Sequence, residues 1–244
     1  MQRYRSIAEG HDLLRARIRE LALIRHRYGY RRLHVLLRRE GFNVGKALVY
    51  RLYCEEGLVL RPRRPRRHVS AAHRQAPIRK AAAPNDAWSM DFVSDQLQNG
   101  NRFRALTIID VHTRECLAIE SGQRMTGEDV VRVLNQLRYR RGAPRRIYCD
   151  NGSEFTSQIL DLWAYHNKVT MEFSRPGKPT DNGHIESFNG SLRDECLNAH
   201  WFSSLADAKD KIAAWLMDYY ESRPHRALNN LTLFEYVAQL ENGA

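Results

Sequence analysis

Three carboxylates in this sequence have the chemistry and the spacing to hold metal ions. Asp91 lies within a predicted strand, Asp150 directly follows another, and Glu186 lies in a predicted helix. Phosphodiester chemistry must activate a hydroxyl and stabilise a departing oxygen, and two divalent ions about 4 Å apart can do both. Mg²⁺ prefers oxygen ligands and usually takes one or two carboxylates together with substrate phosphate. Carboxylates without paired Cys or His residues favour two Mg²⁺ or Mn²⁺ ions over zinc.

Each of these carboxylates also has a purely structural interpretation. An Asp before Asn-Gly is typical of turns, and a Glu on a helix surface is usually solvated. Other polar residues nearby have similar explanations. We expect a strand-end charge at Asp95, a turn or an ion pair with Arg114 at Asp110, a helix-terminus interaction at Glu154, a helix cap at Asp181 and a surface or substrate contact at His184. The functional interpretation therefore depends on the elements that bring the three carboxylates together.

Apolar residues between 88 and 120 predict three antiparallel strands. Trp88, Met90 and Phe92 share one face of the first strand, so Asp91 points to the other face. A turn at Asn99-Gly100-Asn101 predicts a hairpin between the first two strands.

The following segments alternate between helix and strand. A helix precedes a short strand over residues 146–149, which ends at Asp150. Another helix, with Ile159, Leu162 and Trp163 expected on its inner face, precedes a strand over 169–173. Three strands followed by alternating helices and strands predict an α/β domain with a mixed sheet.

The helix that carries Glu186 has two distinct faces. Its buried stripe is expected to be Ile185, Phe188, Leu192 and Cys196. The opposite face, at helical spacings of four, three and four, holds Asn182, Glu186, Asn189 and Arg193. A carboxylate flanked by amides and an arginine, facing away from the core, can meet both a metal ion and a phosphate.

Charge is distributed unevenly along the chain. Residues 1–80 hold 21 Lys and Arg against 6 Asp and Glu, a net charge of +15, whereas residues 81–244 hold 18 against 22, a net charge of −4. Arginine makes up 33 of the 39 cations, which favours planar, bidentate contact with phosphate. The basic segment indicates a nucleic-acid partner, although a solvated face in an arginine-rich protein would have the same composition.

The segment 1–60 predicts a small helical domain. Apolar spacings of three and four predict a helix over 9–27, with Leu13 and Ile24 among its inward residues. Two shorter helices joined by a turn at Gly41 resemble a helix-turn-helix, and a helical oligomerisation domain is the alternative. The cations expected to contact DNA phosphates are Arg31, Arg32, Lys46 and Arg51.

Residues 61–85 are rich in arginine and proline. Proline excludes a stable helix here, so we expect a tether along a phosphate backbone, with contacts from Arg63, Arg64, Arg66 and Arg67. No apolar run approaches the length of about 18 residues that a membrane span needs, and no signal-peptide core is visible at the N-terminus. We therefore expect a soluble protein of the cytoplasm, with no membrane partner.

Several motifs resemble a known family. Asp91, Asp150 and Glu186 follow one another at a spacing that is similar to the D,D(35)E pattern of transposases and retroviral integrases. The segments YCDNGSEF, FSRPGKPTDNGHIESFNGSLRDECLN and YYESRPHRALNNLT resemble the second-frame (OrfB) transposases of the insertion-sequence-three group, and RHRYGYRRLHVLLRREGFNVGKALVYRLYCEEGL resembles their helix-turn-helix. One departure is Leu233, where that family often has proline.

The resemblance implies an RNase-H-like mixed five-stranded sheet with flanking helices, preceded by an all-α helix-turn-helix domain. The expected domains are 1–60 for helix-turn-helix, 61–85 for the linker, 86–200 for the catalytic core and 201–244 for C-terminal helices. The resemblance also implies Mg²⁺-dependent cleavage and strand transfer at transposon ends. The expected DNA partners are the terminal repeats and target DNA, on which the protein would act as a homo-oligomer in the bacterial nucleoid. An upstream-frame (OrfA) protein is expected as a partner or as a fusion.

These expectations give each candidate residue a role. Asp91 and Asp150 would hold the ions, and Glu186 would complete the second ion site. The residues expected to position phosphate are Arg193, Asn182, Arg175 and Lys178. An RNase-H-like nuclease that only hydrolyses DNA, such as a junction resolvase, and a catalytically silent DNA-binding regulator remain as alternatives.

Overall fold

The computed structural model describes residues 11–25, 27–60, 81–175 and 182–242. The chain divides into two compact units, Met1–His68 and Val69–Ala244. Within the described ranges, no helix is long and apolar enough to cross a membrane. The predicted phosphate contacts between positions 61 and 80 lie outside the described residues, as does Lys178.

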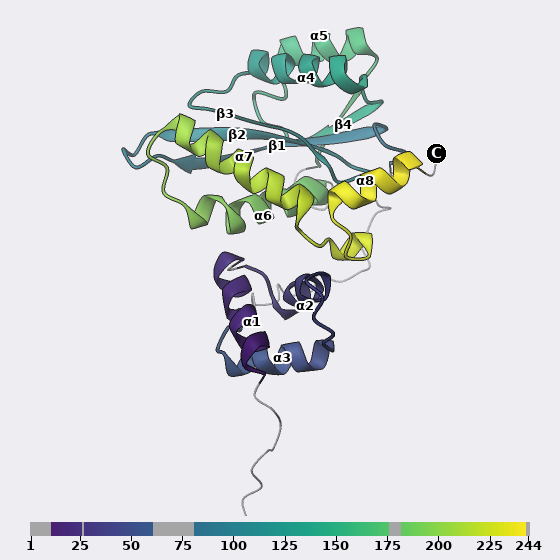
Figure 1. Cartoon of the computed structure of the whole chain (residues 1–244). Helices are drawn as coiled ribbons and strands as arrows, with labels where there is room; N and C mark the ends of the chain where they lie inside the picture. Colours follow the sequence, from purple (N-terminus) through teal and green to yellow (C-terminus); the bar gives the residue numbers. More distant parts are fainter. Residues whose placement is uncertain (1–10, 26, 61–80, 176–181, 243–244) are drawn as a thin grey trace, which may run out of the picture. The chain divides into compact units, whose positions relative to one another are not determined.

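The first unit contains three helices, α1 (Asp12–Ile24), α2 (Tyr30–Arg39) and α3 (Lys46–Glu55) (Figure 1). They share a small apolar core made of Leu14, Ile18, Leu21, Leu33, Leu37, Val49, Leu52 and Tyr53. The prediction of inward positions at Leu13 and Ile24 is wrong, since both side chains are exposed. Helix α1 is shorter than predicted and buries only one narrow stripe, which these two residues flank.

The second unit is built on a five-stranded sheet. Its strands are β1 (Ala87–Gln96), β2 (Arg102–Asp110), β3 (Cys116–Gly122), β4 (Arg146–Cys149) and β5 (Thr170–Phe173), in the order β3-β2-β1-β4-β5. The first three strands pair antiparallel, whereas β4 pairs parallel with both β1 and β5. The mixed sheet predicted from the sequence is thus confirmed, and β1 lies at its centre.

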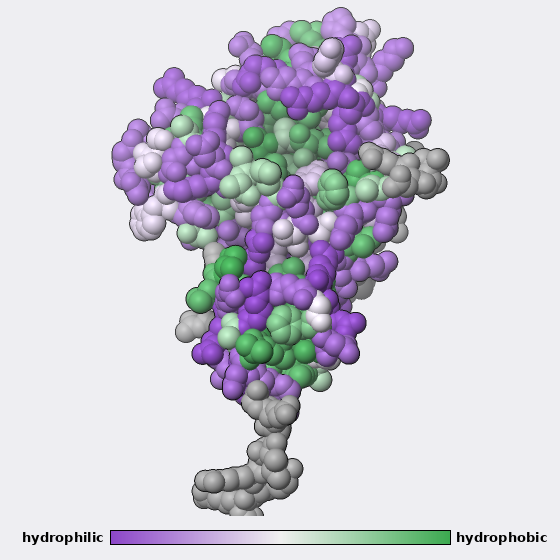
Figure 2. Space-filling model, viewed as in Figure 1, coloured by the Kyte–Doolittle hydropathy of each residue, from purple (hydrophilic) through white to green (hydrophobic). Residues whose placement is uncertain are grey.

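One face of the sheet is covered by α4 (Gly127–Arg141) and α5 (Gln158–Asn167) (Figure 1). The outer surface of this helical layer is mainly hydrophilic (Figure 2). In α5, Leu160 and Trp163 are buried, while Ile159 and Leu162 are exposed, so part of the predicted inner face is wrong. Only Trp163 of the expected set faces the core, because the buried stripe is rotated toward Leu160 and Ala164.

The other face is covered by α6 (Gly183–Glu195) and α7 (Leu205–Glu221). All four residues of the predicted α6 stripe are buried: Ile185, Phe188, Leu192 and Cys196. They pack against apolar residues of α7, including Ile212 and Trp215. The helix that carries Glu186 therefore packs against both the sheet and α7.

Short helical turns and a final helix complete the unit: η3 (Leu197–Ala199), η4 (Arg226–Leu228) and α8 (Leu233–Asn242). Leu233, at the first position of α8, is fully buried. The backbone N–H of Glu235 donates to Thr232 Oγ1 over 3.1 Å, and the Thr232 N–H donates to Glu235 Oε2 over 2.7 Å. This capping box defines the start of the helix.

Candidate active site

Asp91 lies on the central strand, directly opposite Thr107 of β2. Its Oδ1 accepts the N–H of Phe92 over 2.7 Å, and its Oδ2 accepts Nδ2 of Asn189, on α6, over 2.9 Å. Burial raises the pKa of Asp91 above its ordinary value, these hydrogen bonds lower it, and the charges of Asp150 and Glu186 raise it further. The three predicted carboxylates therefore share one electrostatic environment.

Asp150 directly follows β4, the parallel neighbour of β1. Its Oδ1 accepts the N–H of Gly152 over 2.9 Å. A Cβ atom at Gly152 would lie 3.0 Å from Asp150 Oδ1 and 3.4 Å from Glu154 Oε2. A side chain at this glycine would therefore crowd the carboxylates of Asp150 and Glu154, which both border it.

Glu186 lies in the first turn of α6 and its side chain is exposed. Its neighbour Ile185 is fully buried, so the helix directs Glu186 away from the apolar core. The first turn of a helix also favours a negative side chain, because the backbone N–H groups there have no partners within the helix.

Two amides join α6 to the sheet. Asn182 accepts the hydroxyl of Ser89 and donates Nδ2 to the carbonyl of Met90 over 3.5 Å. Asn189 accepts Thr107 Oγ1 over 2.9 Å and donates to Asp91. The expectation that both amides face away from the core is therefore wrong. Both are 8% exposed, because they bond to residues of β1 and β2, whereas Glu186 and Arg193 of the same predicted face are exposed.

The Thr107 hydroxyl lies 2.9 Å from the Asn189 amide oxygen and 3.1 Å from the Asp91 carbonyl oxygen, and it can donate its one proton to either. A hydroxyl that donates to the amide oxygen leaves the NH₂ group facing Asp91. A donor at this position favours the ionised carboxylate and fixes one of its oxygens. Thr107 and Asn189 thus orient Asp91, and neither role was predicted from the sequence. The helical spacing of Asn189 from Glu186 was the one available signal.

An aromatic stack ties the Asp150 loop to β1. The rings of Phe92 and Phe155 are stacked with centroids 5.1 Å apart, and the guanidinium of Arg104 lies 4.1 Å from the Phe92 centroid. Arg104 also forms an ion pair with Glu154, and the bond from Arg104 helps to lower the pKa of Glu154 against the effect of burial. The expected helix-terminus role of Glu154 is therefore wrong, because α5 begins only at Gln158 and Glu154 lies in the preceding loop, where it pairs with Arg104 of β2.

The donor set suits a hard divalent ion, although no three His, Cys, Asp or Glu side chains in the described ranges lie close enough together to hold one. Mg²⁺ needs only one or two carboxylates when substrate phosphate and water supply the remaining ligands. The charges of Asp150 and Glu186 help to raise the pKa of Asp91. A bound cation would offset this repulsion between the carboxylates. The residues present therefore fit Mg²⁺ or Mn²⁺.

The other predicted site residues differ in their burial and in their hydrogen-bond partners. The Asn182 amide is buried and engaged with β1. Arg193 is exposed and donates Nη2 to the carbonyl of Ser94 over 3.2 Å, and Arg175 is exposed after β5. Partial burial of the His184 ring, together with the charge of Arg114, lowers the pKa of His184 to about 4.

The remaining acidic neighbours have structural partners. Asp110 is buried and accepts the N–H groups of Asn85, His112 and Thr113, as expected for a turn residue. Asp95 accepts the N–H of Gln96. Asp181 lies outside the described residues.

The predicted DNA contacts of the first unit are partly engaged within it. Arg31 donates to the Tyr30 hydroxyl over 3.3 Å, and the guanidinium of Arg32 lies 5.1 Å from the centre of the Tyr28 ring. Arg51 lies 3.8 Å from Glu55, and Lys46 is exposed at the first position of α3. All four remain on the surface of the unit, where a phosphate can reach them.

Comparison with family models separates an N-terminal domain from a core domain, as the two compact units of the structure do. Residues 10–66 match an HTH-like domain, and residues 81–179 and 167–232 match two models of the integrase core domain.

Relatives are found among bacterial insertion elements. The chain is 48% identical over 228 residues to the 31.7 kDa protein of insertion element IS407 from Burkholderia multivorans, covering 93% of this chain and 82% of that protein. It is 44% identical to the 39.2 kDa protein of IS476 from Xanthomonas euvesicatoria, covering 92% and 64%. The transposase InsF of insertion sequence IS3A from Escherichia coli is 25% identical, with coverages of 81% and 70%.

Solved structures share the fold. The HTLV-2 integrase catalytic core domain in complex with magnesium superimposes with a TM-score of 0.51 at 17% identity, covering 64% of this chain and 98% of that one. A chain of the simian T-cell lymphotropic virus intasome gives a TM-score of 0.56 at 16% identity, covering 90% and 73%.

Proposed function

Because the chain belongs to the IS3-type (OrfB) insertion-sequence transposases, polynucleotidyl transferases with an integrase core, we propose that Asp91, Asp150 and Glu186 form its catalytic triad. The observation that carries this proposal is the placement of the three residues: Asp91 lies on the central strand β1, Asp150 directly follows its parallel neighbour β4, and Glu186 lies in the first turn of α6, whose Asn189 donates to Asp91. Each comes from a different element, so a common site depends on the fold of the core.

Two Mg²⁺ or Mn²⁺ ions, when bound, would activate the attacking oxygen and stabilise the departing one. Asp91 and Asp150 would hold them, with Glu186 completing the second ion site. Asn189 and Thr107 hold the Asp91 carboxylate in one orientation. The stack of Phe92 on Phe155 holds the Asp150 loop against β1. Catalysis of this kind depends mainly on positioning and on electrostatic stabilisation.

Cleavage and joining would use the same site in sequence. In the first step, a water oxygen bonds to the phosphorus at the transposon end, and the bond to the 3′ oxygen breaks, which leaves a 3′-hydroxyl. In the second, that 3′ oxygen bonds to a phosphorus of target DNA, and the target strand's own 3′ oxygen leaves and is protonated. One phosphodiester is broken for each one formed in the second step.

The DNA partners would be divided between the two units. The HTH-like domain and the net charge of +15 over residues 1–80 support binding of the transposon's terminal repeats there. Arg193 and Arg175, both exposed on the core, would position phosphate near the triad, together with Lys178. We propose action as a homo-oligomer on DNA, joined by the upstream-frame OrfA protein or fused to it.

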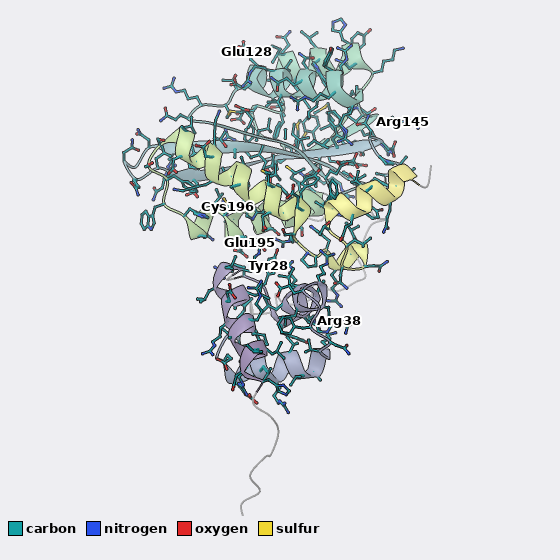
Figure 3. All side chains as sticks on the ribbon, viewed as in Figure 1. Tyr28, Arg38, Glu128, Arg145, Glu195 and Cys196 are labelled. Carbon is teal, nitrogen blue, oxygen red and sulfur yellow. The ribbon has the colours of Figure 1, made fainter. Side chains whose placement is uncertain are left out.

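The test uses labelled end DNA, target DNA and Mg²⁺, with nicked and joined products scored separately. Replacement Glu186→Gln should abolish both products while leaving end binding nearly intact, because it removes a metal ligand and few DNA contacts. The matched control is Glu128→Gln. Glu128 is also an exposed residue in the first turn of a helix, but in α4, on the opposite face of the sheet (Figure 3).

Each result separates the possible functions. Loss of both products with Glu186→Gln alone supports the triad. Hydrolysis without joining by the unmodified chain would identify a nuclease, and binding without either product would identify a DNA-binding regulator. An equal loss of binding and cleavage in Glu186→Gln would show that Glu186 is a structural residue.

A further inference from the structure

A shallow polar cavity lies where β2 begins and β3 ends. It has a volume of about 460 Å³ and is lined by Asn101, Arg102, Gln123 and Arg124. All four side chains carry N–H donors and none carries a negative charge. Guanidinium and amide donors gathered around an open cavity suit an oxyanion, above all a phosphate.

The two arginines of this Arg102–Arg124 cavity are not engaged elsewhere. Among the residues that the structure describes, neither side chain has a hydrogen-bond or ion-pair partner. Arginines nearby differ in this respect, since Arg104 pairs with Glu154 and Arg141 pairs with Glu115. The donors of Arg102 and Arg124 are therefore available to a ligand.

The backbone holds both arginines in place. Arg102 pairs with Gln96 in the β1–β2 ladder. Arg124 lies in a bend over residues 123–124 that follows β3, and a Cβ atom added at Gly122 would lie 2.9 Å from Met125 Sδ and 3.2 Å from the Arg124 carbonyl oxygen. Met125 is buried in the core beneath α4. The absence of a side chain at Gly122 and the anchor at Met125 thus place Arg124 beside the sheet.

The cavity shares a face of β2 with an arginine that contacts the Asp150 loop. Phe103 packs into the core beneath α6 and α7, so Arg102 and Arg104 share the other face of β2, about 7 Å apart along the strand. Arg104 contacts Glu154, whose Oε2 borders Gly152 together with Asp150 Oδ1. Arg102 therefore lies on the face of β2 from which Arg104 reaches the Asp150 loop.

We propose that the Arg102–Arg124 cavity binds a phosphodiester of the DNA strand that reacts at the triad, on the side of Asp150. This subsite rests on the function proposed above. The core carries a net charge of −4 over residues 81–244, so DNA needs a local positive site to approach its carboxylates. Two unpaired guanidinium groups on the Asp150 side of the sheet supply that positive potential where the strand lies.

The experiment compares two charge-matched double variants of the full chain. In one, Arg102→Gln and Arg124→Gln neutralise the cavity. In the control, Arg138→Gln and Arg140→Gln neutralise two exposed arginines in the last turn of α4. This turn lies about 17 Å along the helix from its first residue, which is the end of α4 nearer to Arg124. A third variant, Arg102→Lys with Arg124→Lys, keeps the charge and loses the bidentate geometry. Circular dichroism verifies that each variant is folded.

Two measurements report phosphate contact without catalysis. The first is the salt dependence of DNA affinity, in which each neutralised phosphate contributes a slope of about 0.9. The Gln variant of the cavity should lower the slope by about 1 to 2, and the α4 control should leave it nearly unchanged. The Lys variant should keep the slope and lose affinity. The second is a scan in which single phosphates are replaced by neutral methylphosphonates.

The scan should locate one or two phosphates whose neutralisation weakens binding by the unmodified chain and not by the Gln variant of the cavity. Their position in end DNA or in target DNA identifies which strand the cavity holds. Equal salt slopes for the cavity and α4 variants, or a scan that is identical in the unmodified chain and the cavity variant, would overturn the proposal. A chain that binds DNA but makes no product would refute only the proposed function.

Discussion

Replacing Asn189 with alanine should impair metal-dependent activity far beyond its effect on folding. The replacement removes the bond to Asp91 Oδ2, which is 2.9 Å long, and leaves the Asp91 carbonyl oxygen, 3.1 Å away, as the acceptor for Thr107 Oγ1. A hydrogen bond to a charged group contributes about 1.5–3 kcal/mol. At about 1.4 kcal/mol for each factor of ten, we expect a roughly 10- to 100-fold loss of cleavage rate, together with a higher Mg²⁺ requirement.

The chain supplies a matched control in Asn182→Ala. Asn182 is buried to the same extent, directly precedes the same helix and likewise bonds to β1, but it contacts Ser89 and Met90 and not a carboxylate. Both variants should lose similar stability, about 1–3 kcal/mol for an unsatisfied buried group. Only Asn189→Ala should shift the Mg²⁺ titration of cleavage.

The assay measures cleavage of labelled end DNA across a range of Mg²⁺ concentrations, with thermal unfolding recorded for both proteins. A conservative pair at Thr107 adds a second comparison. Thr107→Ser keeps the hydroxyl that orients the amide and should keep the normal Mg²⁺ requirement, whereas Thr107→Val should raise it. If both Asn variants lose activity only in proportion to their stability, Asn189 is a structural residue and the reasoning is wrong.

Three further results follow from the same structure. Gly152→Ala should lower cleavage at least tenfold with little change in thermal unfolding, because its Cβ would lie 3.0 Å from Asp150 Oδ1; normal cleavage would contradict the tight loop. The pKa of His184 is lowered to about 4, so the unfolded chain binds a proton there before the folded chain does, and stability should fall as pH drops from about 6.5 toward 4. His184→Asn should reduce this loss in denaturant titrations, and an unchanged pH dependence would count against it. Finally, a fragment of residues 81–244, with its net charge of −4, should bind DNA more weakly and with a smaller salt slope than the full chain; equal slopes would show that the basic N-terminal arginines do not contact the backbone.

The sequence was sufficient to predict the sheet and to nominate the proposed triad. Strand periodicity placed Asp91 opposite the face of Trp88 and Met90, and the structure has Trp88 and Met90 in the core beneath α4 and α5. The apolar stripe of α6 was also predicted correctly. These features depend on local periodicity, which a single sequence displays directly.

What the sequence could not show depends on how elements cross one another. Asn189 shares a helix face with Glu186 and looked solvent-facing, but β1 lies beneath that part of α6, so the amide is buried. The Arg102–Arg124 cavity requires the pairing of β2 with β3 and the bend that follows β3, which bring together residues that are far apart in sequence. Periodicity within one element cannot reveal contacts between two.

The parallel pairing of β4 with β1 determines when the site can form during synthesis. The β1–β2–β3 meander uses neighbouring segments and can pair as soon as it is made, whereas β4 must return from beyond α4 to lie beside β1. Contacts between distant segments form late in folding. A chain released early by the ribosome would therefore carry the HTH-like unit and the meander without Asp150 or Glu186.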